Sequence, residues 1–317
     1  MTRNCFKPLG RSALGEADVI GSQRFALTDR EFERIAEIAR DLAGLDLGPG
    51  KKALVSGRLA RRVRLLGLDG FADYCAHVLE PDAEEERGHM IAALTTNVTA
   101  FFREAHHFSH LRDVVLPDLN RAALDGLPVR IWSAGCSSGQ EPYSIALTLL
   151  ASMANVGALD FRIIATDIDS NMLRLATTGI YPDDAVAEIE PDLRRRFFHP
   201  VGEGGQWKID DIVRDLVVFR RLNFAKTWPV RGPFDIIFCR NVTIYFGEAM
   251  RQTMWAGFAR LLRPGGRLYI GHAERIGAPA SDYFVPDGTT VYRRTDAVCH
   301  DPAPPAERRL NLSITIR

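Results

Sequence analysis

The hydrophobic pattern of this chain changes period after the segment Gly126-Leu127-Pro128. Beyond it, apolar runs of strand length alternate with amphipathic runs of helical length, an order typical of parallel sheets with right-handed crossovers. The alternation predicts an α/β fold with a doubly wound sheet. We expect strands at 129–134, 161–166, 216–222, 234–239 and 267–272, helices at 141–153, 170–178 and 248–262, and a late antiparallel strand within 288–294.

The stretch Val129–Leu147 is central to this prediction. It indicates a buried strand, a turn bearing Gly135 and Gly139, and a helix with Glu141 in its first turn, where a carboxylate is favoured. Such an order begins the nucleotide site of doubly wound folds. The Gly-x-x-x-Gly spacing is not the dinucleotide fingerprint, however, so the turn names no cofactor and a dehydrogenase is the least favoured reading.

The residues before this alternation divide into a leader and a helical region. Residues 1–24 lack periodicity and predict a mobile leader. Thr28 and Glu31 match a capping box. Residues 25–95 predict an all-helical domain, and 96–126 a linker with a connecting helix. The helices are expected from about 28 and at 51–67, 71–80, 83–95 and 104–124, with Leu54, Val55, Leu59, Val63 and Leu66 as the core face of the second.

The remaining boundaries follow from breaks in the pattern. Residues 127–295 predict the large α/β domain. Within it, 191–215 fit neither a helix nor a crossover and indicate a small β-hairpin insertion. The proline-bearing end, 296–317, predicts a disordered tail.

Composition excludes several classes. Formal charge is balanced, with 40 basic and 40 acidic residues, and gives no reason to expect a nucleic-acid partner. Five scattered cysteines favour reduced thiols in a cytoplasmic protein. The sequence has neither an apolar run long enough for a membrane span nor an apolar signal core, so we expect no membrane insertion. We expect a monomer.

Polar residues follow the predicted strands where ligands of such sheets bind. Asp167 ends the second strand and suits the hydroxyls of a ribose, although helix capping is the alternative; for Asp169 capping is favoured. Cys239, Arg240 and Asn241 follow another apolar strand. Tyr245 comes soon after, and the residues alone leave open whether it serves the site or packs in the core.

Two further segments carry alternatives. Residues 95–103 place two phenylalanines among polar groups before the α/β domain, which suits a lid or a plain hydrophobic hinge. His106, His107 and His110 include an i, i+4 pair, but without a third ligand in view we predict a solvated helix face and no metal.

The helix at 51–64 is basic and holds no acidic residue. Its cations suit either a solvated face or an acidic partner surface, and we favour the partner. They are Lys51, Lys52, Arg58, Arg61, Arg62 and Arg64.

Four ordered motifs give the chain a specific resemblance. Asn97-Val-Thr-Ala-Phe-Phe-Arg103, Trp132-Ser-Ala-Gly-Cys-Ser-Ser-Gly-Gln-Glu-Pro-Tyr, Ala165-Thr-Asp-Ile-Asp and Phe234-Asp-Ile-Ile-Phe-Cys-Arg-Asn-Val together resemble the CheR family of S-adenosylmethionine-dependent chemoreceptor methyltransferases, over roughly residues 28–295. The resemblance implies a class I methyltransferase-like fold. It also implies methyl transfer to glutamate side chains of receptors, with S-adenosylhomocysteine as the product.

The resemblance further implies which residues act. Arg103 and Tyr245 would lie nearest the transferred methyl. Together with Gly135 from the turn, the expected cofactor contacts are Asn97, Thr99, Arg103, Glu141, Asp167, Asn223, Phe224, Cys239, Arg240 and Asn241. The N-terminal helices, with Arg58, Arg61 and Arg62, and the hairpin insertion would contact the cytoplasmic methylation helices of the receptor.

The chain departs from the family pattern at two positions. Gln140 stands where an acid is usual, and Thr243 where a bulky apolar residue is usual, which could alter the surroundings of Tyr245. The insertion looks short, so we do not assume docking through a receptor tether. Two rival functions are a methyltransferase acting on RNA or a small molecule, and a non-catalytic sensor that binds S-adenosylmethionine.

Overall fold

The computed structural model describes residues 26–153 and 156–297. The described residues form two compact units: one holds those up to Ile38 and Leu47–Leu94, the other Ala39–Asp46 and those from Thr95 on. The predicted leader lies outside the described residues, as does most of the predicted tail. Among the described residues, no helix combines the length and apolar character that crossing a membrane requires.

The first unit is helical, as predicted. Its helices are α2 (Asp29–Ala43, whose last residues belong to the second unit), a 3-10 turn η1 (Pro49–Lys51), α3 (Lys52–Leu65), α4 (Phe71–Leu79) and α5 (Glu84–Leu94). The capping box is confirmed: Thr28 N–H donates to the Glu31 carboxylate at 2.8 Å, and Glu31 N–H donates to the Thr28 hydroxyl at 3.2 Å.

The expected core face of α3 is only partly correct. Val55, Leu59 and Val63 are buried at helical spacing. Leu54 and Leu66 are exposed by 43% and 36%, so the prediction of them as core is wrong. Leu54 lies one residue from the buried stripe, and successive residues of a helix point in directions about 100° apart.

The second unit is built on a seven-stranded sheet of order β6-β2-β1-β7-β8-β10-β9. The pairs among β6, β2, β1, β7 and β8 are parallel, and β10 and β9 are added antiparallel. The strands are β1 (Val129–Ala134), β2 (Phe161–Asp167), β6 (Val217–Arg221), β7 (Phe234–Cys239), β8 (Leu262–Ile270), β9 (Phe284–Gly288) and β10 (Val291–Arg294). The doubly wound sheet and the late antiparallel strand are confirmed.

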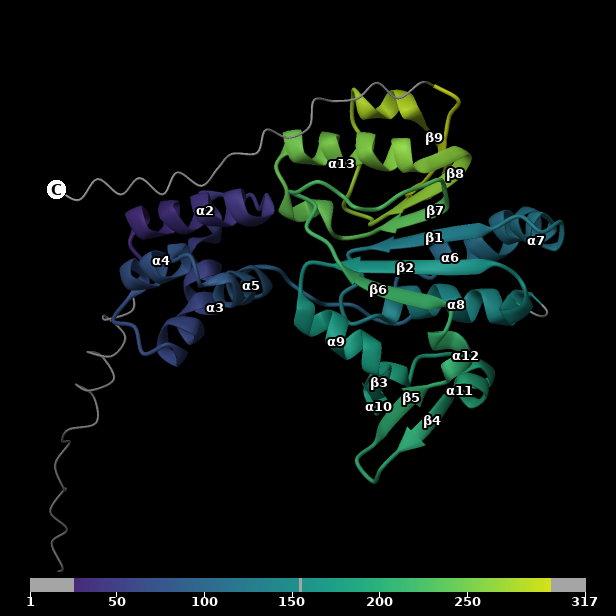
Figure 1. Cartoon of the computed structure of the whole chain (residues 1–317), viewed down its shortest axis with the longest axis horizontal. Coiled ribbons are helices and arrows are strands. Elements are labelled where there is room, and N and C mark those ends of the chain that lie inside the picture. The colour runs from purple at the N-terminus through teal and green to yellow at the C-terminus, as the bar shows by residue number, and fades with distance from the viewer. Residues whose placement is uncertain (1–25, 154–155, 298–317) are drawn as a thin grey trace, which may run out of the picture. The chain divides into compact units, whose positions relative to one another are not determined.

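Helices cover both faces of this sheet, with α8 on one side and α13 on the other (Figure 1). Strand alternation explains the two cores: Ile131 of β1 packs in the cluster that includes α8, whereas the Trp132 ring contacts Phe258 of α13. The helices are α8 (Gln140–Ser152), α9 (Ser170–Thr178) and α13 (Glu248–Leu261), with short 3-10 turns η3 (Val156–Ala158), η4 (Thr243–Tyr245) and η5 (Ala280–Tyr283).

The connecting helix predicted at 104–124 is confirmed over 106–124, with a change of hydrogen-bond pattern in its middle. It consists of α6 (His106–His110), a π-helical turn η2 (Leu111–Val115) and α7 (Leu116–Leu124). Pro117 lies in the first turn of α7, where a missing N–H is tolerated.

The predicted hairpin is part of a larger insertion. Strands β4 (Phe198–Val201) and β5 (Gln206–Ile209) form the expected antiparallel hairpin, but β3 (Ile180–Pro182) adds a third strand in the order β3-β5-β4. The expectation that 191–215 lacks helices is wrong, because α11 (Pro191–Phe197) and α12 (Asp211–Arg214) lie there; α10 (Asp183–Val186) precedes them. Glu190 caps α11 by accepting the N–H groups of Asp192 and Leu193, and Pro191 in its first turn is a helix-start signal that the sequence does contain.

Candidate active site

The order of the sheet strands reverses at β1, which has β2 on one side and β7 on the other. Ligands of open α/β sheets bind at the carboxyl ends of the strands beside such a point. The turn after β1 is tight. Gly135 has a φ of +91°, and a Cβ added there would lie 2.3 Å from Val242 Cγ2. Glycine is therefore required by the approach of the segment after β7, a reason that the sequence did not reveal.

Asp167 joins the end of β2 to this turn. Its carboxylate accepts the Ser137 N–H at 2.7 Å and the Asp169 N–H at 2.9 Å, and the side chain is buried. Burial raises the pKa of Asp167, although the backbone donors oppose the shift. Each carboxylate oxygen keeps a second acceptor position, so the pair of oxygens can accept hydrogen bonds from the two hydroxyls of a ribose.

Asp169 caps α9, as predicted. It accepts the Asn171 N–H at 2.8 Å and the Met172 N–H at 3.4 Å. The same carboxylate accepts the Asn97 side-chain amide at 2.9 Å. Asn97 is thereby held against the turn after β1, where its backbone carbonyl also accepts the Ser137 hydroxyl at 3.1 Å.

The segment 97–103 turns sharply at Arg103. Phe102 and Glu104, on either side of it, have φ values of +51° and +59°, which residues with a side chain rarely adopt. The Ser144 hydroxyl fixes the backbone of Phe102 by accepting its N–H at 2.9 Å. Arg103 itself is half-buried and donates to the Val98 carbonyl at 2.8 Å, and Thr99 between them is half-buried.

A buried guanidinium links this segment to the Gly turn. Arg240 Nη1 donates to Glu141 at 3.1 Å, its Nη2 lies 3.4 Å from Glu104 Oε2, and it also donates to the Arg103 carbonyl. Glu141 further accepts the Ser133 hydroxyl at 2.7 Å. Burial raises the pKa of Glu141, while Arg240 and Ser133 oppose the shift. Paired charges explain why Arg240 tolerates burial.

The resemblance placed Arg240 and Glu141 in the cofactor site without indicating this ion pair. Glu104 is a residue that sequence reasoning missed. Its only sequence signal is an acid beside Arg103, and its partner Arg240 is distant in the chain.

Tyr245 lies in η4 beyond β7 and is half-buried. Its hydroxyl donates to the Thr96 carbonyl at 3.1 Å and accepts the Thr96 N–H at 3.2 Å. These bonds bring Tyr245 to the start of the 97–103 segment, and the side chain is not a fully buried core aromatic.

The other expected residues lie at the same sheet edge. Cys239 ends β7 and is fully buried, which raises the pKa of its thiol well above the usual range. Asn241 has a φ of +58°. Asn223 follows β6, next to Asp167, because the Leu222 N–H donates to the Asp167 carbonyl at 2.9 Å. The Asn223 side chain bonds the Leu42 carbonyl at 2.7 Å, and the Phe224 ring packs on Trp132.

The two departures from the family pattern have defined surroundings. Gln140 is buried and accepts the Ser138 hydroxyl at 2.8 Å. Thr243 is also buried, and its hydroxyl donates to Glu274 at 2.8 Å.

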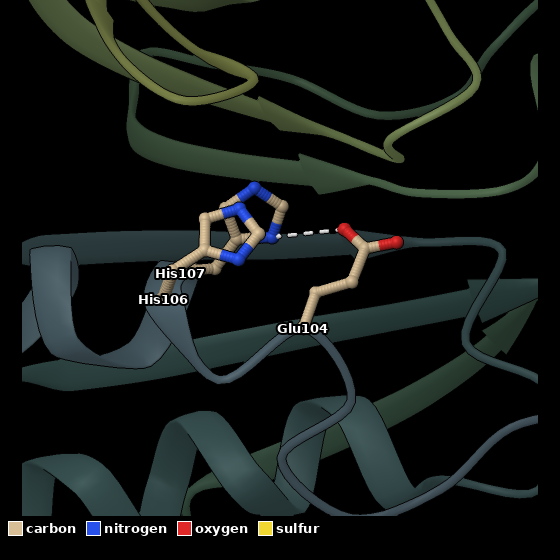
Figure 2. Close-up of side chains that lie close together, drawn as sticks. All are labelled: Glu104, His106 and His107. Atoms are coloured by element: carbon tan, nitrogen blue, oxygen red, sulfur yellow. Dashed lines mark ion pairs between the residues drawn. The ribbon is translucent and has the colours of Figure 1, made fainter.

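The prediction of a solvated helix face is wrong for His107, which is fully buried; His106 is exposed and His110 is half-buried. His110 accompanies Tyr269, 3.0 Å from its hydroxyl, whereas Glu104, His106 and His107 bring possible ligand atoms within 4.8 Å of one another (Figure 2). His107 Nδ1 lies 3.5 Å from Glu104 Oε2, and burial lowers the pKa of His107 to about 3. A metal ion bound by Glu104 would lie close to the positively charged Arg240, which pairs with the same carboxylate, and repulsion between the two cations disfavours a metal.

Two cations of the basic helix α3 form ion pairs with acidic residues elsewhere in the helical unit. Arg62 pairs with Glu86 of α5, donating to Oε1 at 3.1 Å and also to Oε2, and Lys52 pairs with Asp29 at 2.6 Å. These two cations of the predicted partner surface therefore already have acidic partners within the helical unit. Arg58 donates to the Leu94 carbonyl at 2.8 Å, and Arg61 is exposed.

Comparison with known proteins identifies the architecture. The family described as "CheR methyltransferase, SAM binding domain" matches residues 97–292, and "CheR methyltransferase, all-alpha domain" matches residues 30–95. The chain belongs to the CheR methyltransferase family. It is an enzyme that uses S-adenosylmethionine as its methyl donor.

Curated relatives match this chain over most of their own length. The chain is 49% identical over 255 residues to a probable chemotaxis protein methyltransferase of Rhizobium etli, covering 80% of this chain and 95% of that one. It is 40% identical to chemotaxis protein methyltransferase 2 of Pseudomonas aeruginosa, covering 86% and 96%. It is 38% identical to the chemotaxis protein methyltransferase of Escherichia coli, covering 86% and 93%.

Proposed function

We propose that this CheR-family enzyme methylates glutamate side chains of bacterial chemoreceptors in the cytoplasm and releases S-adenosylhomocysteine. The observation that carries the proposal is its similarity, over nearly the whole length of the relatives, to proteins named chemotaxis methyltransferases. The tie between the 97–103 segment and the Gly turn supports it further, because this brings Arg103 to the carboxyl edge of the sheet.

The residues assigned to the cofactor lie on segments that meet at this edge. Asp167 offers acceptor positions for ribose hydroxyls, and Arg103 offers a guanidinium for the methionine carboxylate. The backbone of Asn223 and Phe224 is assigned rather than their side chains, which are engaged with Leu42 and Trp132. The remaining assigned residues are Asn97, Thr99, Gly135, Glu141, Cys239, Arg240 and Asn241.

The chemistry requires little from the protein beyond alignment. S-adenosylmethionine supplies an electrophilic methyl group on a sulfonium. A glutamate side chain, with a reference pKa of about 4.3, is already ionised at neutral pH, so no general base is needed. The protein must orient and partly desolvate that carboxylate. We assign the orientation to Tyr245, whose hydroxyl is itself held by both polar groups of the Thr96 backbone.

The partner proposed is the glutamate-rich methylation region of a receptor. Arg61 is exposed on α3, and Arg58 lies one turn before Arg62. Charges at the rim of such an interface mainly raise the association rate and are screened by salt. Arg62 holds Glu86, so we assign it to the structure of the helical unit as well as to the basic surface.

The deciding experiment follows methyl transfer from labelled S-adenosylmethionine to cytoplasmic receptor fragments and, in parallel, to total RNA. The proposal expects label in the receptor that is released as methanol in base. Label in RNA alone would favour the rival methyltransferase. Tight cofactor binding without transfer to any receptor would favour a non-catalytic sensor.

A further inference from the structure

The segment 240–243 presents a problem of hydrogen bonding. It follows β7, turns through Asn241 at a φ of +58°, and enters η4, which carries Tyr245. Its successive N–H groups lie beyond the last pairing of β7 with β8, at Cys239 and Ile270. Buried backbone donors require acceptors, and a positive φ at a residue with a side chain persists only where the surroundings enforce it.

One carboxylate meets this need. Glu274 Oε1 accepts the N–H groups of Val242 at 3.0 Å and Thr243 at 2.7 Å, and the Thr243 hydroxyl at 2.8 Å. Its Oε2 accepts the N–H groups of Asn241 at 3.0 Å and Gly271 at 2.6 Å. The residue is only 3% exposed, and all five donors are uncharged groups.

The same carboxylate fixes two loops to each other. Gly271 follows β8, and a Cβ added to it would lie 2.5 Å from Asn241 Nδ2 and 2.8 Å from the Asn241 nitrogen. The exits of β7 and β8 are thus in close contact, with Glu274 bonded to both. The Asn241 backbone has little freedom while this carboxylate is present.

The five hydrogen bonds accepted by Glu274, here called the Glu274 clamp, hold two residues that we assign to the active site. Asn241 belongs to the proposed cofactor segment, and Tyr245 follows through η4, where its N–H donates to the Val242 carbonyl at 3.3 Å. Val242 also fills the space beside Gly135 in the turn after β1. A shift of 240–243 would therefore move groups on both sides of the proposed reaction.

We infer that Glu274 is a positioning residue for methyl transfer, acting through Asn241 and Tyr245. Thr243, one of the two departures from the family pattern, is a donor to this clamp. The inference rests on the proposed function for the role of Tyr245, but its effect on the cofactor site does not require a receptor.

The test compares Glu274→Gln with Glu248→Gln. Glutamine keeps the size of the side chain but turns an amide NH₂ toward backbone N–H donors, so the clamp cannot be satisfied. Glu248 is an exposed acid at the start of α13 and controls for the loss of one carboxylate charge by the same substitution. Displacement of reacting groups by about 1 Å costs on the order of 100-fold in rate, and we expect a kcat loss of that order for Glu274→Gln.

The measurements are kcat and KM with receptor fragments, S-adenosylhomocysteine affinity by calorimetry, and the thermal midpoint. We expect kcat and S-adenosylhomocysteine affinity to fall in Glu274→Gln, while its KM for the receptor is unchanged. Glu248→Gln should keep the wild-type kcat, KM and affinity. Wild-type kcat and affinity in folded Glu274→Gln, with only a lower midpoint, would overturn the inference.

A second variant keeps the test decisive if Glu274→Gln does not fold. Thr243→Val removes one donor and preserves side-chain shape. A kcat loss at an unchanged midpoint supports the inference, and wild-type kcat overturns it. If the wild-type enzyme transfers no methyl to receptors, the proposed function fails, while S-adenosylhomocysteine binding by the variants still decides the role of Glu274.

Discussion

Replacing Arg62 by alanine should destabilise the helical unit, whereas replacing its neighbour Arg61 should not. Both arginines lie on α3, and their sequence environments are nearly the same. Arg62, however, donates to both oxygens of Glu86, a side chain that is only 6% exposed. Arg61 is exposed.

The magnitude follows from what the substitution leaves behind. Removing one partner of a buried ion pair typically costs about 3–5 kcal/mol, because the other charge stays buried. Tyr74 continues to donate to Glu86 at 2.7 Å, and Arg62 is itself partly exposed, so we expect a loss at or just below the lower end of this range, about 2–3 kcal/mol. A surface substitution such as Arg61→Ala is expected to stay within about 0.5 kcal/mol.

The assay is denaturant unfolding of the full chain, followed by the hydrogen-exchange protection of amides in the helical unit. Arg62→Ala together with Glu86→Gln should recover part of the loss, since the buried charge is then removed. Equal stability of Arg62→Ala and Arg61→Ala would refute the reasoning and return Arg62 to a solvated basic face.

Three further predictions concern the second unit. Asp167→Ala should weaken S-adenosylhomocysteine binding through lost ribose bonds, and unchanged calorimetric affinity would remove that role. Arg103→Ala should depress turnover severely with Arg103→Lys intermediate; near-normal turnover would exclude Arg103 from the site. Because burial lowers the pKa of His107 to about 3, the unfolded chain takes up a proton below about pH 6.5 that the folded chain does not. Stability should therefore fall as pH drops from about 6.5 toward 3, and His107→Gln should flatten this dependence in pH-scanned unfolding.

Periodicity predicted most of the sheet because each strand is buried or half-buried in a regular pattern. The parallel strands ended close to where the apolar runs end. Strand β9 was missed because Pro286 interrupts its pattern; proline is tolerated there since β9 is the edge of the sheet. The third strand of the insertion, β3, contains only Ile180–Pro182 and is too short to give a periodic signal.

The site was predicted less completely, for a physical reason. Local signals placed Asp169 as a helix cap and Asp167 at a strand end. The pairing of Arg240 with Glu141 and Glu104, and the five donors gathered by Glu274, join residues far apart in the chain. The sequence around a single acid in a loop does not indicate which backbone N–H groups will donate hydrogen bonds to it. Only the sheet order brings those groups together.

The most direct test of the central claim is the position of the methyl groups on a receptor. The enzyme and S-adenosylmethionine are incubated with cytoplasmic receptor fragments, and the products are mapped by mass spectrometry before and after mild base. The account predicts methyl esters on specific glutamate side chains that disappear in base and are absent with Arg103→Ala. Base-stable methylation of other side chains, or esters formed equally well by Arg103→Ala, would contradict it.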